Sequence, residues 1–201
     1  MSTFIRDFIE REKINRRNFL LASAMGAGSL MLPGSLRRAV AADGTAMAWS
    51  YRDRASAYWN AIVSGGEAYV ESLGLNKSAM TSLINEGSSE KSLSDIKAFL
   101  AKNNGNCAIA CDANDSPNAR PVAEAVQAAG GYVSTIWNKT DDVHPWDFGD
   151  NWVSHMTWSD EKPAEETARI LFKAMGGKGG VVHLGGIAAN NPAVERLNGL
   201  K

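Results

Sequence analysis

The chain has 201 residues, of which 44% are hydrophobic and 21% charged, and its formal net charge at pH 7 is −1. Residues 1–43 hold seven of the 21 basic side chains and four of the 22 acidic ones, so the remainder carries a formal charge of −4. This weakly acidic balance argues against nucleic acid or an anionic membrane as a partner. The remaining residues suffice for one domain with its own hydrophobic core.

The N-terminal segment carries an export signal pattern. INRRNFLL at residues 14–21 places two arginines before an uncharged run that reaches about Leu36, and AVA at 39–41 is a small-x-small cleavage signal. This order resembles a bacterial twin-arginine export leader. The alternative is a membrane-anchoring helix, but the run falls short of the ~20 residues that a spanning helix needs. We therefore expect a signal peptide over residues 1–42 and a soluble mature protein in the periplasm.

Short apolar runs and helical periodicity alternate along the rest of the chain. We expect strands at 46–51, 79–84, 107–111, 132–137, 152–158 and 181–184, and helices at 58–73, 94–102 (starting as early as 89), 117–129, 163–175 and 192–200. This alternation predicts an α/β fold, with a parallel sheet and helices on both faces. The connection 138–151 is rich in Asp, Asn, Pro and Gly, and we expect it to run over the surface near a cleft.

Cysteine and histidine positions argue against a disulfide and against a metal. Cys107 and Cys111 are four residues apart, which on a strand means roughly 13 Å on one face, too far for a disulfide. CxxxC alone also lacks further ligands at zinc-like spacing. His155 and His183 fall within apolar strand-like runs, which favours buried histidines over metal ligands. No cofactor is expected, because GGKGG at 176–180 is interpreted as a helix cap and turn rather than a phosphate loop.

Ligands of parallel sheets bind beyond the carboxyl ends of the strands, so the residues that follow each expected strand are candidates. They include aromatic rings, amides, carboxylates and arginines, which suit the C–H faces and hydroxyl groups of a sugar. No nucleophile stands beside a base, so we do not expect an enzyme. These strand-end positions are Tyr51, Arg52, Asp53, Arg54, Ser56, Tyr58, Trp59, Asp112, Asn114, Asp115, Ser116, Trp137, Asn138, Asn190 and Asn191.

Structural roles compete with ligand binding at several of these positions. Tyr58 and Trp59 can be core residues of the first helix. Asn114 and Asp115 can instead cap the helix that begins near Pro117, although a cap and a ligand contact are compatible.

Several segments resemble the ribose-type periplasmic binding proteins, the two-lobed type I sugar receptors of ABC transporters. VVHLGGIAANNPAVERLNGLK at 181–201 is similar to the segment that opens their second lobe. SYRDRASAYWNAIVSGGEAYVESLG at 50–74 resembles their first strand-to-helix unit, and KSLSDIKAFL at 91–100 resembles their second helix. WVSHMTWSDEKPAEETARILF at 152–172 resembles the crossover between lobes. The resemblance covers essentially all of 44–201.

The resemblance implies a domain organisation and a function. Residues 43–160 would form the first ligand-binding lobe and 161–201 the beginning of a second, within a receptor about 120–160 residues longer. The family binds a monosaccharide between two lobes that close on it, and the closed form docks on an ABC transporter permease. It therefore implies a cofactor-free, monomeric binding protein.

Carried over by position, the resemblance also implies the ligand contacts. Two departures from the family pattern disfavour ribose: Val194 stands where ribose-type members place a sugar-binding arginine, and Ser92 where many have Gln. Arg52 and Arg54 are candidates to replace the lost arginine, which leaves another monosaccharide or a polyol as the expected ligand. The implied contacts, with Arg52 added, are Ser56, Tyr58, Trp59, Asn114 or Asp115, Asn138, Asn190 and Asn191.

Three other functions are alternatives to a transport receptor. A periplasmic sensory receptor, for chemotaxis or a quorum ligand, would share the fold and differ in its partner. The effector domain of a transcription regulator would also share the fold, but the export leader argues against it, as does the lack of a helix-turn-helix motif before residue 44. An exported glycoside hydrolase would need a carboxylate pair, and none stands out in the sequence.

Overall fold

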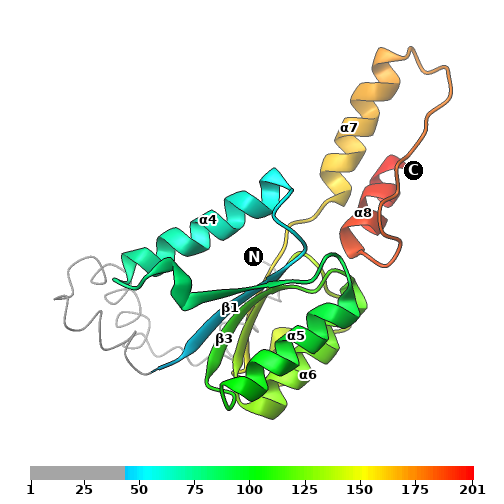
Figure 1. The fold of residues 1–201 in the computed structure, drawn as a ribbon. Coiled ribbons are helices and arrows are strands. Elements are labelled where there is room, and N and C mark those ends of the chain that lie inside the picture. The colour runs from blue at the N-terminus through cyan, green and yellow to red at the C-terminus, as the bar shows by residue number, and fades with distance from the viewer. Residues whose placement is uncertain (1–43) are drawn as a thin grey trace, which may run out of the picture. The chain divides into compact units, whose positions relative to one another are not determined.

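A computed structural model describes residues 44–201, so the predicted export leader lies outside the described residues. The strands are β1 (Ala46–Tyr51), β2 (Met80–Ile84), β3 (Cys107–Asp112), β4 (Tyr132–Ile136) and β5 (Trp152–Met156). The helices are α4 (Ala57–Ser72), α5 (Ser89–Lys102), α6 (Ala119–Ala129), α7 (Glu161–Ala174) and α8 (Asn191–Leu200) (Figure 1). Short 3₁₀ segments are η1 (Lys77–Ala79), η2 (Ser116–Asn118) and η3 (Pro145–Phe148).

The five strands of the described region form one parallel sheet in the order β2-β1-β3-β4-β5. The register aligns Tyr51 with Ile84 and Ser50 with Cys111. Because the strands are parallel, their carboxyl ends meet at one edge of the sheet, where the candidate residues are expected. The predicted α/β fold with a parallel sheet is confirmed.

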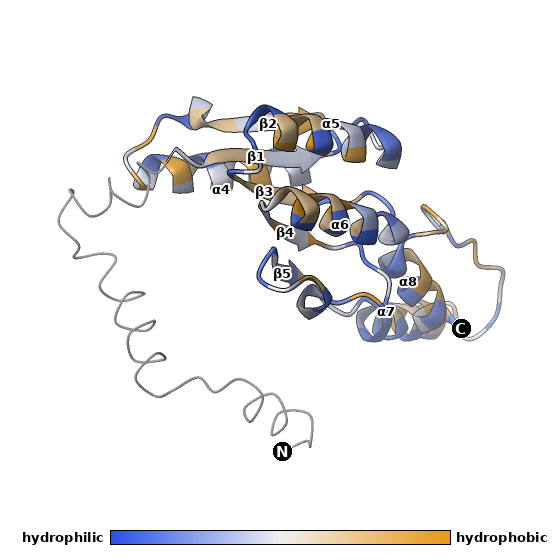
Figure 2. Cartoon of the chain, turned by 90° about the horizontal axis from the view of Figure 1, so that it is seen from below, coloured by the Kyte–Doolittle hydropathy of each residue, from blue (hydrophilic) through white to orange (hydrophobic). Residues whose placement is uncertain are grey.

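Helices cover both faces of the sheet, with α4 on one face and α5 and α6 on the other (Figures 1 and 2). The larger core lies under α5 and α6, where Ile96, Val122 and Val126 meet Ile109 and Val133 of the sheet. Figure 2 shows apolar and polar stretches side by side along these helices, as expected for elements with one buried face.

The smaller core, under α4, is aromatic. Tyr51, Trp59 and Val63 are buried there, and Trp49 and Trp137 pack against them. Large rings bury much apolar surface, which compensates for the presence of a single covering helix. Because Tyr51 ends β1 and Trp137 directly follows β4, this core extends to the carboxyl edge of the sheet.

Local signals fix the helix ends. Ser88 Oγ accepts a hydrogen bond from the Lys91 N–H at the start of α5, and α6 ends at Gly130 in the left-handed conformation, at φ 77°. Gly105, also left-handed at φ 76°, lies so close to α6 that a Cβ would collide with the carbonyl group of Ala129. The turn before β3 therefore requires glycine.

Buried polar and thiol groups line the face beneath α5. Cys107 and Cys111 are free thiols, and burial raises the pKa of Cys111 to about 12. Ser92 Oγ lies 3.0 Å from Ser50 Oγ, and both side chains are fully buried. Ser92, which departs from the family pattern, thus lies within the interface between α5 and the sheet.

One expected strand is absent. Residues 181–184 form no strand in the described region, and Val182 and Leu184 are 88% and 90% exposed. An apolar β-branched run forms a strand only where a neighbouring strand supplies hydrogen bonds, and residues 44–201 supply none here. His183 is consequently exposed, which corrects its predicted burial. His155 is partly buried in β5, as predicted, and burial lowers its pKa to about 4.

The connection 138–151 also departs from expectation. Val143 and Phe148 are buried in the larger core, and η3 forms around Phe148. Other residues of the connection, such as Asp141, Asp142 and Trp146, are exposed as expected.

The last two helices pack against each other. Gly199 of α8 faces the first turn of α7 so closely that a Cβ would collide with the Glu161 carbonyl. Within residues 44–201, every helix is too short or too polar to cross a membrane.

Candidate functional site

The order of the strands reverses between β1 and β3, which are neighbours in the sheet although β2 separates them in the chain. After β1 the chain enters α4 on one face, and after β2 it enters α5 on the other (Figure 1). In open parallel sheets, ligands bind outside the strand ends at such a reversal. The residues that follow β1, β3 and β4 are therefore the candidate site.

Four rings form a continuous cluster at this edge, here called the aromatic wall: Tyr58, Trp59, Trp137 and Trp158. The Tyr58 centroid lies 5.0 Å from that of Trp59 and 5.4 Å from that of Trp137, and the Trp137 centroid lies 5.9 Å from that of Trp158. Trp59 is buried and anchors α4, whereas Tyr58 is 39% exposed. The wall thus exposes the rings of Tyr58 and Trp158 to solvent, whereas Trp59 is buried.

Beside the aromatic wall lies a buried polar pair, Asp112 and Asn138. Asn138 Nδ2 donates a 2.7 Å hydrogen bond to Asp112 Oδ1, and the backbone N–H of Asn114 donates to the same oxygen at 3.3 Å. Burial raises the pKa of Asp112 to about 6, although these hydrogen bonds and the charge of Arg52 act in the opposite direction. Burial, and secondarily the charge of Asp112, raises the pKa of Tyr58. The pair therefore lies next to the aromatic wall.

The two arginines after β1 have different roles. Arg52 is exposed, lies across Gly87 in the turn after β2, and pairs loosely with Asp53, at 3.9 Å from Nε to Oδ2. Arg54 Nε donates to the Tyr51 hydroxyl at 2.8 Å, and its Nη2 reaches Glu67 of α4 at 3.3 Å. Arg54 therefore ties α4 to β1, and Arg52 is the arginine that remains open to a ligand.

An ion pair between Arg196 and Asp160 lies against Trp137 and Trp158 of the aromatic wall. Arg196 Nη2 of α8 donates to Asp160 Oδ2 at 3.1 Å, and its guanidinium carbon lies 5.9 Å from the centre of the Trp137 ring. The indole N–H of Trp158 donates to the other Asp160 oxygen at 3.1 Å. Arg196 and Trp158 thus both contact Trp137 from elements outside the sheet.

The start of α8 is bonded to the carboxyl edge of the sheet. The Asn191 N–H donates to Ser116 Oγ at 2.8 Å, and the Ser116 N–H donates to the Ala189 carbonyl at 3.3 Å. Asn191 Nδ2 also reaches Asp141 Oδ1 at 3.2 Å. The Asn190 amide oxygen is buried and lacks a hydrogen-bond donor in the described region. Asn190 and Asn191 therefore do lie near the strand ends, although the strand expected before them is absent.

The predicted site residues divide into two groups. Arg52, Tyr58 and Asn138 lie near Asp112, and Trp59 packs beside Tyr58 in the smaller core. Ser56 is the N-cap residue of α4, two residues before Tyr58, and makes no side-chain cap bond.

Asn114 and Asp115, by contrast, hold the start of α5. Asn114 Nδ2 donates to the Ser88 carbonyl at 3.3 Å, and Asp115 Oδ2 accepts from Ser89 Oγ at 2.8 Å. Asp115 does occupy the N-cap position of η2, which contains Pro117, but its side chain makes no cap bond there. The side-chain bonds of both residues therefore hold α5.

The predicted contacts omitted four residues that the structure brings into the cluster. Asp112 and Trp137 are strand-end residues outside the predicted contacts, and Trp158 and Arg196 come from more distant segments. The sequence does carry a signal for Asp112. It is an acidic residue at the end of a buried strand, where a carboxylate needs hydrogen-bond donors.

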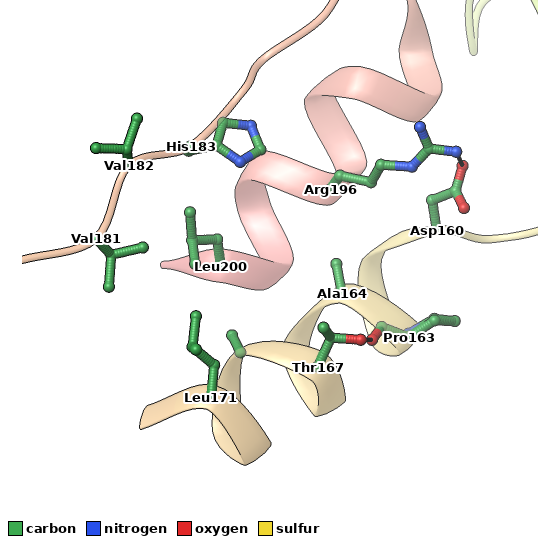
Figure 3. A pocket seen from close by; sticks show the side chains of 11 residues that line it. Asp160, Pro163, Ala164, Thr167, Leu171, Val181, Val182, His183, Arg196 and Leu200 are labelled. Carbon is green, nitrogen blue, oxygen red and sulfur yellow. Dashed lines mark hydrogen bonds and ion pairs between the residues drawn. The ribbon is translucent and has the colours of Figure 1, made fainter. Parts of the chain in front are cut away.

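A hollow of about 390 Å³ lies between α7, α8 and Val181–His183 (Figure 3). Its lining is mostly apolar, with Leu171, Val182 and Leu200 among its members. Figure 3 shows the Asp160–Arg196 pair at one end, away from the valines. The two charged residues of the lining, Asp160 and Arg196, are bonded to each other. In the described part of the chain, no three or more His, Cys, Asp or Glu side chains are placed to hold a metal ion.

Comparisons with known proteins identify the fold. No protein-family model matches the chain, and no curated protein matches it. Among solved structures, it is similar to a twin-arginine translocation pathway signal protein from Burkholderia phytofirmans, with 47% identity and a TM-score of 0.72 over 78% of this chain and 48% of that one. The chain has a type I periplasmic-binding-protein fold.

Two more distant structures share this type I fold. GanP, a glucose-galactose binding protein from Geobacillus stearothermophilus, is 15% identical with a TM-score of 0.62, over 79% of this chain and 52% of that one. The fructose-binding periplasmic domain of a hybrid two-component system is 17% identical with a TM-score of 0.56, over 76% and 47%. The chain spans about half the length of the solved structures that it matches.

Proposed function

We propose that this protein is the periplasmic solute-binding component of an ABC transporter, which captures a monosaccharide or a polyol between two lobes and delivers it to a membrane permease. The observation that carries this proposal is the aromatic wall beside the buried Asp112–Asn138 pair, at the reversal of strand order. Sugars need this combination, because their C–H faces pack on rings and their hydroxyl groups bond carboxylates and amides.

The comparisons support the same assignment. GanP is a sugar-binding protein with this fold, and the relative at 47% identity is described as a twin-arginine pathway protein. The twin-arginine pattern at 14–21 agrees with export to the periplasm. The proposed contacts are Arg52, Tyr58 and Asn138 on the sheet side, with Asp112 added, and Asn190 and Asn191 at the start of α8.

Isothermal titration calorimetry of the purified protein tests the proposal. The panel holds hexoses, pentoses and alditols, and each is recovered after titration to check that it is chemically unchanged. We expect saturable binding of at least one member and no turnover. An absence of binding across the panel would overturn the proposal, and conversion of a bound sugar would instead indicate an enzyme.

A second function has one specific observation in its favour. The fructose-binding domain of a hybrid two-component system shares the fold, so a sensory receptor for a sugar-like signal is the alternative. A permease and an ATPase encoded beside this chain would favour transport, whereas a neighbouring histidine kinase would favour sensing.

A further inference from the structure

Trp137 has an unusual backbone for a bulky residue. It directly follows β4 and lies in the left-handed region, at φ 68°, which is sterically costly for a large aromatic side chain. Its N–H donates to the Met156 carbonyl at 2.9 Å, so its backbone is fixed at the edge of the sheet. Such costly conformations persist where the surrounding structure holds them, and they cluster at ligand sites.

The Trp137 ring is surrounded by groups from three other segments. Tyr58 contacts it from α4, Trp158 from the connection before α7, and Arg196 from α8. Packing on this scale accounts for the position of the ring. It does not explain what the indole N–H of the ring bonds to.

The indole N–H of Trp137 is buried and has no acceptor among the groups of residues 44–201. Buried tryptophan N–H groups ordinarily find one, because an unmade hydrogen bond is costly. The next residue has the complementary deficit: the Asn138 amide oxygen is buried without a donor, while its Nδ2 is bonded to Asp112. One hydroxyl group can accept a hydrogen bond and donate another, so it could satisfy both atoms.

We propose that Trp137 determines specificity in this site, its indole N–H donating a hydrogen bond to one ligand hydroxyl, which in turn donates to the Asn138 amide oxygen. This inference rests on the proposed function, since it takes the ligand to be a monosaccharide or a polyol. Trp137 and Asn138 belong to the sheet edge, whereas Trp158 and Arg196 cover the ring from outside the sheet. The ligand reaches the N–H when that cover shifts.

Calorimetry with two substitutions tests this role. Trp137→Phe keeps an aromatic ring and removes the N–H. Trp146→Phe is the matched control, because Trp146 is 68% exposed and its ring stacks on that of His144, outside the aromatic wall. The ligands are the tightest-binding member of the sugar and polyol panel and its complete set of monodeoxy analogues. We expect Trp137→Phe to weaken binding of the parent ligand about 5- to 10-fold, and Trp146→Phe to leave it unchanged.

The analogues separate hydrogen bonding from packing. One monodeoxy analogue should bind the wild type about 5- to 10-fold more weakly than the parent and show no further loss with Trp137→Phe. Each of the other analogues should bind Trp137→Phe more weakly than it binds the wild type, as the parent ligand does. If Trp137→Phe weakens the binding of every analogue equally, Trp137 acts by packing alone and the inference is overturned. It is also overturned if the variant binds the parent ligand as tightly as the wild type does.

Two further results are informative. If Trp137→Phe does not fold, 3-benzothienyl-alanine at position 137 replaces the N–H by sulfur at nearly the same shape, with the same expected pattern. If the wild type binds no member of the panel, the proposed function and this inference both fall. If the wild type binds and the position 137 variants match it, only this inference falls.

Discussion

Asn138 donates a 2.7 Å hydrogen bond from its side-chain amide to Oδ1 of Asp112, which joins the ends of two neighbouring strands. The Asp112 and Asn138 side chains are 3% and 2% exposed, so the carboxyl group is held out of water. Burial raises the pKa of Asp112 to about 6, and the hydrogen bond from Asn138 limits that rise. The pair therefore makes the stability of the fold sensitive to mildly acidic pH.

The first prediction concerns stability against pH. The pKa of Asp112 in the folded protein lies above its ordinary value of 3.8, so the folded state binds this proton more tightly than the unfolded chain. Its stabilising contribution is complete below about pH 4 and is lost as the pH rises through about 6. Relative to Asp112→Asn, the wild type should lose up to about 3 kcal/mol of unfolding free energy between pH 4 and pH 7. Urea denaturation at intermediate pH values measures the unfolding free energy of both proteins. If the two free energies change with pH in parallel, the prediction is contradicted.

The second prediction concerns the partner of Asp112. At pH 7, Asn138→Ala leaves a buried, mostly ionised carboxyl group without its side-chain donor, which should lower the unfolding free energy by about 1–3 kcal/mol. In the Asp112→Asn background the same substitution should cost clearly less, because the charge is gone. A double-mutant cycle by urea denaturation gives the coupling, and additive effects would show that the hydrogen bond does not contribute.

The third prediction concerns Tyr58, an exposed ring of the aromatic wall. Tyr58→Ala should weaken binding of the best ligand about 10-fold or more, because it removes the exposed ring that α4 contributes to the wall. Tyr69→Ala is the matched control, since Tyr69 is an exposed tyrosine near the other end of α4. Titration calorimetry compares the two variants, and equal losses would place the ligand away from Tyr58.

The fourth prediction separates two left-handed glycines. Gly130→Ala should cost about 1–2 kcal/mol through backbone strain alone, because nothing lies within 4 Å of the added Cβ. Gly105→Ala has nearly the same φ but also drives its Cβ into the Ala129 carbonyl, so it should cost at least about 2 kcal/mol more. Urea denaturation of both variants provides the comparison. A Gly105→Ala protein as stable as Gly130→Ala would mean that α6 can move away without cost.

Much of the fold could be predicted from sequence because each element carries its own local signal. The runs AMAWSY and CAIAC are apolar enough for buried strands, and Gly130 marks the end of α6. VVHL at 181–184 carries the same kind of signal and is not a strand, because pairing depends on a neighbour rather than on the run itself. Composition alone likewise could not show that Val143 and Phe148 fold back into the core.

The site was predictable at the level of strand ends but not of side-chain direction. Parallel topology places Arg52, Asp112 and Asn138 at one edge, as the sequence analysis expected. Whether a polar side chain there faces a ligand or holds a helix depends on bonds such as that between Asp115 and Ser89. The contact between Arg196 and Trp137 joins residues 59 positions apart, so no local pattern could indicate it.

The Trp137–Trp158 contact also gives the protein an intrinsic optical reporter. The two indoles lie 5.9 Å apart with their planes at 34°, close enough for their electronic transitions to couple. Trp137 belongs to the edge of the sheet and Trp158 to the chain leading into α7, so a rotation of α7 and α8 would change that angle. Near-ultraviolet circular dichroism can therefore follow this movement in the unlabelled protein.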